Sequence, residues 1–219
     1  MGDVWTWGAE VGGNLWRTTG DITDSWASMA GIGFSQGKCS PYAMPGHWND
    51  PDMLVVGQVG WGPELRKTKL TPDEQYTHIS LWSMLVAPLL LGCDLSQLDA
   101  FTLSRLTKDE VIAVNQDPTG MQAIQIKEED GTQIWKKEMM DGSIAVGLFY
   151  TGTSSPEEAI LWDSKIRSKP IGINWEKLGI SGQHMVRDLW QQKDLGIFDK
   201  HFTSPVNYHG VVLLRISKR

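Results

Sequence analysis

The sequence lacks features that would mark whole classes of protein. Among its 219 residues it has only two cysteines, Cys39 and Cys93, and neither belongs to a C-x-x-C pattern. That argues against a disulfide framework or a structural zinc site. No apolar run approaches the roughly 20 residues that span a bilayer. The longest run, residues 84–91, is interrupted by Pro88 and is typical of buried core.

Positive charge is also scarce. The chain has 20 Lys and Arg against 26 Asp and Glu, a net charge of −6. Nothing resembles a basic face that could neutralise phosphates, so we expect no nucleic-acid partner and no membrane partner. The five histidines show no metal-ligand spacing, and residues 50–52 (DPD) supply too few ligands for a calcium loop. We therefore expect no metal and no cofactor.

Tryptophan, by contrast, is abundant, with eleven residues. The apolar faces of indole rings pack against the C–H faces of sugars, which makes tryptophan common in saccharide sites. The same side chain also fills large cores, because it buries much area per residue. Composition alone leaves both interpretations open.

The first part of the chain, residues 1–119, alternates strand ends with helices. Thr71, Pro72 and Glu74 form an N-terminal capping box for a helix with one apolar face. Strands are expected at residues 15–21, 47–54 and 88–94, and the last of these is expected to be buried on both faces. Helices are expected at residues 23–34, from residue 72, and at residues 109–114. A second capping box, at residues 107–110, precedes the last helix. This rhythm predicts a parallel α/β fold.

From residue 120 onward the pattern changes to short alternating segments separated by turn signals such as Asp130-Gly131. Strands are expected at residues 122–127, 132–138, 143–150, 157–162, 183–189 and 209–216. Residues 120–219 are thus predicted to form an antiparallel β-sandwich domain.

Acidic residues follow the expected strands: Asp21, the pair Asp50 and Asp52, and Asp94. In parallel α/β barrels the carboxyl ends of the strands converge on one face, and glycosidic cleavage requires two carboxyl groups. An Asp after a strand is also a common helix N-cap. Three such positions, two of them near a tryptophan, favour a sugar site.

Longer motifs make the chain recognisable. They are residues 16–22 (WRTTGDI), 46–54 (GHWNDPDML), 81–82 with 87–90 and 94–95, 111–118 (VIAVNQDP), and finally 186–190 and 209–214. In this order they resemble the signatures of glycoside hydrolase family 27, the α-galactosidases, over essentially the whole chain.

The resemblance implies a fold and roles for particular residues. Residues 1–119 would be the C-terminal part, strands six to eight, of a (β/α)8 barrel, followed by an antiparallel β-sandwich. Asp21 matches the general acid/base, and Arg17 matches a residue that hydrogen-bonds sugar hydroxyls near the reacting carbon. Asp52 and Met53 match positions that line the sugar pocket, with Asp50 as a structural neighbour.

The chain also departs from the family pattern. The family's nucleophile is an Asp in a Lys-Tyr-Asp-type motif, and no such motif occurs in this sequence. We therefore expect a fragment that begins just before the sixth barrel strand. An open barrel exposes apolar faces and strand edges, so self-association or a companion chain is expected to cover them.

The resulting hypothesis is a retaining exo-α-galactosidase that acts on terminal α-linked galactose of α-galactoside saccharides. The alternatives are a sister specificity, such as α-N-acetylgalactosaminidase or an isomaltodextran-cleaving enzyme, a non-catalytic carbohydrate-binding module, and an assembly role. The family is commonly secreted, periplasmic or lysosomal, and no signal peptide is visible at the start of this sequence.

Overall fold

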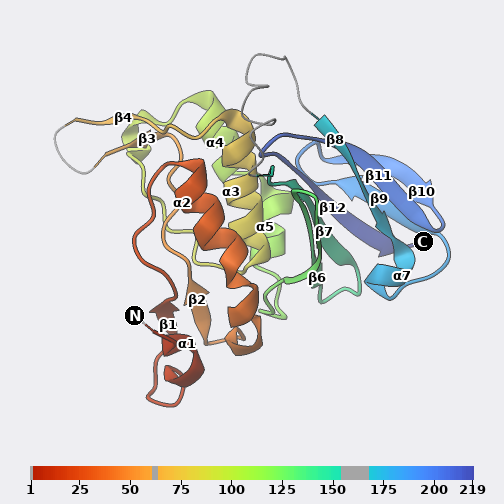
Figure 1. Ribbon diagram of the computed structural model, residues 1–219, viewed down its shortest axis with the longest axis horizontal. Helices are drawn as coiled ribbons and strands as arrows, with labels where there is room; N and C mark the ends of the chain where they lie inside the picture. The colour runs from red at the N-terminus through yellow and green to blue at the C-terminus, as the bar shows by residue number, and fades with distance from the viewer. Residues whose placement is uncertain (1, 61–63, 154–167) are drawn as a thin grey trace. The chain divides into compact units, whose positions relative to one another are not determined.

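The structure, a computed structural model, describes residues 2–60, 64–153 and 168–219 and divides into two compact units. The first unit is Met1–Ala123 and the second is Ile124–Arg219. Figure 1 shows that helices dominate the first unit, whereas the second is built mostly of strands. No helix within the described residues combines the length and the apolar character that crossing a membrane would require.

The first unit contains short strands between helices. Its elements are α1 (Val4–Trp7), β1 (Leu15–Arg17), α2 (Trp26–Gly33), the 3-10 helix η1 (Phe34–Tyr42), β2 (Trp48–Asp50), β3 (Gln58–Val59), β4 (Arg66–Lys67), α3 (Pro72–Met84), the 3-10 helix η2 (Leu95–Gln97), α4 (Ala100–Leu106) and α5 (Asp109–Asn115).

Parallel strand pairing organises this unit, as predicted. β1 and β2 pair in parallel, with Arg17 opposite Asp50, and an isolated parallel bridge joins Leu54 to Leu91. The prediction that residues 88–94 form a strand buried on both faces is wrong. Beyond that one bridge the segment has no ladder, and Leu90 and Leu91 are 52% and 42% exposed. Burial on both faces needs a covering layer on each side, and the described residues leave these two side chains uncovered.

Helix α3 begins where the capping box predicts. Thr71 Oγ1 accepts a hydrogen bond from Glu74 N, while Glu74 Oε2 accepts one from Thr71 N. Both bonds satisfy backbone donors that the first helical turn leaves without partners. Figure 1 shows α2 and α3 running side by side.

The second predicted capping box, at residues 107–110, is wrong. Thr107 ends helix α4, and its hydroxyl donates to Leu103 O instead of capping α5. Helix α4 itself was not predicted from periodicity, although Asp99 caps it by accepting a hydrogen bond from Thr102 N over 2.7 Å. A threonine hydroxyl can bond to the preceding turn or cap the next helix, and the sequence does not distinguish the two.

The second unit is the predicted antiparallel β-sandwich. Its strands are β5 (Ile124–Glu129), β6 (Thr132–Glu138), β7 (Ile144–Tyr150), β8 (Ser168–Asn174), β9 (His184–Asp188), β10 (Lys193–Phe198), β11 (His201–Asn207) and β12 (Val211–Lys218), with a short helix α7 (Trp175–Leu178). One sheet has the order β10-β9-β12-β7-β6-β5, and the other pairs β11 with β8. The predicted strand at 157–162 lies outside the described residues.

Strands β8, β10 and β11 escaped prediction because their sequences carry little alternation. β11 even contains Pro205, which lies opposite Pro170 of β8. Proline has no N–H to donate to a neighbouring strand, so its presence argues against a strand. It is nevertheless tolerated in edge strands. In a sheet of two strands, both strands are edges.

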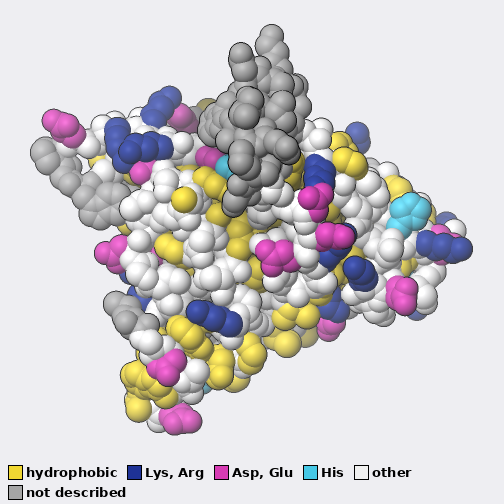
Figure 2. Space-filling view, in the orientation of Figure 1, with side chains coloured by type: hydrophobic (Ala, Val, Ile, Leu, Met, Phe, Trp, Pro, Cys, Tyr) yellow, Lys and Arg dark blue, Asp and Glu magenta, His cyan; other side chains and the backbone are white. Residues whose placement is uncertain are grey.

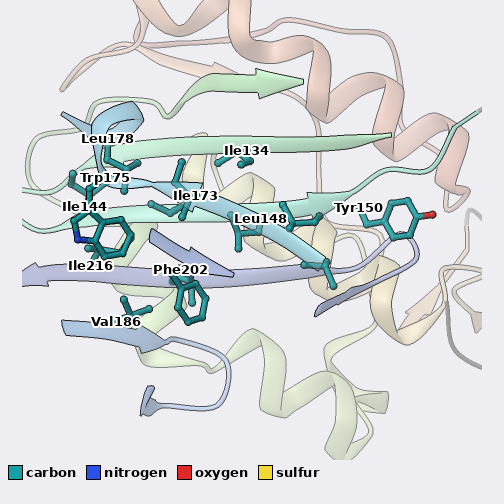
Figure 3. Packing of buried hydrophobic residues seen from close by; sticks show 14 residues of the cluster. Ile134, Ile144, Leu148, Tyr150, Ile173, Trp175, Leu178, Val186, Phe202 and Ile216 are labelled. Carbon is teal, nitrogen blue, oxygen red and sulfur yellow. The ribbon is translucent and has the colours of Figure 1, made fainter. Parts of the chain in front are cut away.

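The core of the sandwich lies between its two sheets. Ile134 and Leu148 of the larger sheet and Ile173 and Phe202 of the smaller sheet belong to one buried cluster, which Figure 3 shows from close by. Each such side chain contributes roughly 1.5–3 kcal/mol when it is removed from water. Hydrophobic packing therefore holds the two sheets together.

Candidate functional site

An open pocket lies in the first unit at the carboxyl ends of β1 and β2. Its volume is about 390 Å³, and it is lined by Arg17, Asp21, Ile22, Thr23, Asp52 and Met53. Because β1 and β2 run in parallel, their carboxyl ends lie side by side, and the segments that follow them meet there. This pairing brings together residues about 35 positions apart in the chain.

Asp21 lies on the irregular segment between β1 and α2, and its side chain is 94% exposed. Among the described residues its ion-pair contact is with Arg17 Nη2, 3.3 Å from Asp21 Oδ1. A carboxyl group that faces an open pocket and is held by so few bonds can exchange protons with a bound molecule and with water.

Asp52 is fixed far more tightly. Its Oδ2 accepts hydrogen bonds from Arg17 Nη2 and from Ile22 N, both over 2.8 Å, and its Oδ1 accepts from Met53 N. Its backbone is left-handed, with φ of 87°, which is unusual for a residue other than glycine. This conformation turns the carboxylate back toward β1 and joins the ends of the two strands.

Asp50 has a structural position. It is 4% exposed, and its Oδ1 accepts a hydrogen bond from Asp52 N over 2.8 Å, while its carbonyl accepts from Thr18 N of the neighbouring segment. Burial raises the pKa of Asp50, and the Asp52 N–H and the nearby Arg17 charge oppose that rise. Asp50 thus supports the turn that carries Asp52 and does not line the pocket.

Arg17 supplies the positive charge of the pocket. Its Nη2 contacts Asp52 Oδ2 at 2.8 Å, Gly20 O at 3.0 Å and Asp21 Oδ1 at 3.3 Å. Its Nε is buried without a hydrogen-bond partner among the described residues. The guanidinium therefore joins both pocket carboxylates and still has donor capacity to spare.

Helix α3 supports the strand end from behind. Trp82 Nε1 donates to Asp52 O over 2.7 Å, and Val55 N donates to His78 Nε2 over 3.1 Å. Burial lowers the pKa of His78 to about 3, so the ring is neutral and can accept this bond. The two residues are one helical turn apart, and they hold both ends of the segment from Asp52 to Val55.

The structure brings four of the sequence-predicted residues into one pocket: Arg17, Asp21, Asp52 and Met53. Asp94 does not line this pocket. Its carboxylate caps η2 by accepting a hydrogen bond from Ser96 N, which agrees with the alternative that an Asp after a strand is a helix N-cap. The tryptophans near the acids do not line the pocket either. Trp16 is buried and donates to Asn49 Oδ1.

Two pocket residues were not singled out from the sequence, namely Ile22 and Thr23. They follow Asp21 directly in the chain, so the motif that contains Asp21 could have indicated them as pocket residues. The supporting contacts from Trp82 and His78 were missed as well. The sequence showed both on a helix but gave no sign of which backbone groups they bind.

Comparison with known proteins gives consistent results over both units. Residues 9–117 match the family described as Alpha galactosidase A, and residues 129–216 match the Alpha galactosidase C-terminal beta sandwich domain. Alpha-galactosidase 2 of Arabidopsis thaliana is 36% identical over 99% of this chain, and an α-galactosidase of Cyamopsis tetragonoloba is 33% identical over 99%. The chain spans 50% and 48% of these proteins.

Solved structures agree. A GH27 β-L-arabinopyranosidase from Geobacillus stearothermophilus superposes with a TM-score of 0.84 and 30% identity, covering 99% of this chain and 47% of that one. Alpha-galactosidase I from Mortierella vinacea gives a TM-score of 0.83 and 27% identity, over 97% of this chain and 55% of that one. The predicted fold class, a partial barrel followed by a β-sandwich, is confirmed. The chain belongs to the α-galactosidase family, glycoside hydrolase family 27, and corresponds to the C-terminal portion of its members.

Proposed function

We propose that this chain supplies the general acid/base and part of the sugar pocket of a retaining exo-α-galactosidase. The observation that carries the proposal is the pocket itself, where the exposed Asp21 carboxyl faces the same space as Arg17 and the fixed Asp52. An exposed proton donor beside a charged wall fixed by hydrogen bonds is what glycosidic cleavage needs. A pocket, as opposed to a long groove, suits a terminal sugar.

In the proposed first step, Asp21 donates its proton to the glycosidic oxygen while the bond from that oxygen to the anomeric carbon breaks. A second carboxylate attacks the anomeric carbon and forms a glycosyl-enzyme. Asp21, now ionised, then takes a proton from the water that releases the sugar. In retaining enzymes the two carboxyl groups lie roughly 5–5.5 Å apart. Arg17, whose side chain lines the pocket and is 28% exposed, would donate from its guanidinium to sugar hydroxyls.

Asp52 is a poor candidate for the second carboxylate. Its two oxygens already accept hydrogen bonds from Arg17, Ile22 N and Met53 N. Hydrogen bonds to a carboxylate lower its nucleophilicity because they stabilise its charge. With no Lys-Tyr-Asp motif in the sequence, we propose that the nucleophile belongs to polypeptide outside these 219 residues.

Exposed apolar surface in the first unit fits a site that is shared with other polypeptide. Trp7, Val11, Leu15, Leu90 and Leu91 are exposed, and β1 pairs only with β2 among the described residues. Figure 2 shows hydrophobic side chains gathered where α1 and β1 lie. We propose that further polypeptide, either a second copy or a companion, covers this surface.

A second specificity has a particular observation in its favour, the β-L-arabinopyranosidase to which this chain is similar. β-L-Arabinopyranose has the ring stereochemistry of α-galactose but no hydroxymethyl group on C5. The same pocket walls could therefore bind either ring. Comparing methyl α-galactoside with methyl β-L-arabinopyranoside as ligands discriminates the two candidates, because the better ligand identifies the specificity.

Sugar binding can be tested without turnover. In protein labelled with ¹³C at the methionine methyl groups, we expect galactose to shift the signal of Met53, a lining residue, and to leave that of the exposed Met140 in place. Glucose, which differs from galactose only at C4, serves as the control ligand. An unmoved Met53 signal, or an equal response to glucose, would contradict a galactoside pocket.

A further inference from the structure

The segment that carries Asp21 has no regular structure of its own. It runs from the end of β1 at Arg17 to the start of α2 at Trp26, and the Asp21 side chain is almost fully exposed within it. A general acid has to be aimed at the leaving oxygen to within a fraction of an ångström. Bonds to its neighbours in the segment must therefore fix its direction.

One anchor lies directly after Asp21. Ile22 N donates to Asp52 Oδ2 over 2.8 Å, and the Ile22 side chain is buried. This bond ties one side of the segment to the end of β2. On the other side of Asp21, Gly20 O accepts a hydrogen bond from Arg17 Nη2 over 3.0 Å.

The second anchor lies three residues after Asp21. Arg66 contacts both oxygens of Asp24, with Nη1 2.5 Å from Oδ2 and Nη2 3.0 Å from Oδ1. Lys69 N donates to the same Oδ2 over 2.8 Å. The Asp24 side chain is only 6% exposed, and the hydrogen bond from Arg66 is the main cause that lowers its pKa. Two-point pairing of this kind fixes orientation as well as distance.

Arg66 is itself held in place by the β3–β4 hairpin. β3 and β4 pair in antiparallel fashion, with Val59 opposite Arg66, and Val59 is fully buried. Thr68 N donates to Gly57 O across the base of the hairpin. The guanidinium is thus mounted on a paired element that follows β2, next in the chain to the segment that carries Asp52.

We propose that the Asp24–Arg66 pair is a positioning device, which holds the Asp21 segment against the β3–β4 hairpin and thereby aims the Asp21 carboxyl at the leaving group. The inference rests on the proposed function in the role it gives Asp21. Asp24 and Arg66 do not line the pocket and act only through Asp21. Two contacts, Ile22 N with Asp52 and Arg66 with Asp24, then anchor the part of the segment that follows Asp21.

Hydrogen exchange tests the anchoring in the full chain without any need for turnover. In Arg66→Met, which keeps the aliphatic stem but removes the guanidinium, we expect the amides of Ile22 and Lys69 to exchange at least about tenfold faster, because the segment opens locally more often. The control is Arg215→Met, which removes a similar pair with Asp141 in the sandwich. Unchanged exchange at Ile22 in Arg66→Met would overturn the proposal.

A leaving-group comparison tests the positioning. Dinitrophenolate leaves a dinitrophenyl galactoside without protonation, whereas methyl α-galactoside loses methanol only when the acid protonates its oxygen. We therefore expect Arg66→Met to slow the methyl substrate roughly tenfold or more and the dinitrophenyl substrate little. Arg66→Lys should recover part of the loss. Equal losses on both substrates would overturn positioning. Both substrates are assayed with azide, which takes the place of the nucleophile that we assign to other polypeptide. If the wild type with azide hydrolyses neither, the proposed function fails, and hydrogen exchange still decides whether the pair anchors the segment.

Discussion

Arg17 Nη2 lies 2.8 Å from Asp52 Oδ2, so the ends of two neighbouring parallel strands are joined by a charge-assisted hydrogen bond. The same carboxylate oxygen accepts Ile22 N, the residue after the proposed acid/base. Asp52 therefore links strand β1, strand β2 and the Asp21 segment at one point. Changes at this point should alter sugar binding and stability together.

Asp52→Asn tests that link. An amide offers one accepting oxygen, so the residue can no longer accept from Arg17, Ile22 and Met53 together. We expect a loss of roughly 1–3 kcal/mol in the free energy of unfolding and at least about tenfold weaker galactose binding. Urea unfolding and a galactose titration measure the two effects.

The control is Asp188→Asn, which disturbs a buried carboxylate bonded to Gln191 in the sandwich and should lower stability without changing galactose binding. Wild-type affinity in Asp52→Asn would argue that the link does not serve the pocket.

Trp82→Phe removes the donor that holds the left-handed backbone of Asp52. The carbonyl of Asp52 would be left buried without its partner, which costs about 1–3 kcal/mol. We expect weaker galactose binding because the strained turn relaxes and the carboxylate moves. Trp135→Phe is the matched control, since Trp135 Nε1 donates to Gln133 Oε1 within the sandwich. Equal sugar affinity in both variants would show that Trp82 has no special part in the pocket.

His78 should make stability depend on pH in a defined window. Its pKa is about 3 in the folded protein against an ordinary 6.5, so between these values the unfolded chain binds a proton that the folded one does not. Stability from neutral His78 is complete above pH 6.5 and is lost as the pH falls toward 3, at up to about 1.4 kcal/mol per pH unit.

In His78→Gln this component of the pH slope should disappear, while the side-chain oxygen can still accept from Val55 N. The exposed His201→Gln should keep the wild-type slope. Urea unfolding at a series of pH values between 4 and 7 gives the comparison. A wild-type slope in His78→Gln would mean that the ring is not held neutral.

The sequence motifs marked residues that lie together in the structure, whereas several of the helices and strands around them were not predicted. Long motifs marked Arg17, Asp21, Asp52 and Met53, and the structure places all four at one pocket. The anchoring pair of Asp24 and Arg66 could not be predicted, because its members are 42 residues apart and each is an ordinary surface residue type. Pairing of that kind depends on how two loops meet in space.

Prediction of the fold was also limited by contacts between segments that are distant in the sequence. The turn at Asp130-Gly131 has positive φ at both residues, and that dipeptide was correctly interpreted as a turn between two strands. Residues 88–94 look like a doubly buried strand because their side chains are apolar, but burial depends on neighbours and not on the segment. The left-handed backbone of Asp52 has no sequence signal, since such a conformation is usually found at glycine.

We expect self-association from the apolar surface of the first unit. We expect the wild-type chain to be oligomeric in light scattering at micromolar concentration, because Leu90 and Leu91 are large, apolar and exposed. The double variant Leu90→Glu and Leu91→Glu should shift the population toward monomer. Leu103→Glu, a similarly exposed leucine on α4, is the control. A clean wild-type monomer would contradict this expectation.

The most direct test of the central claim is nitrophenol release from p-nitrophenyl α-galactoside by the purified chain, with and without azide, alongside Asp21→Asn. Azide should raise the rate, because it forms the new bond to the anomeric carbon in place of a carboxylate while Asp21 protonates the departing oxygen. The account predicts release that falls roughly 10²-fold or more in Asp21→Asn. Equal release by the two proteins would contradict an acid/base role for Asp21.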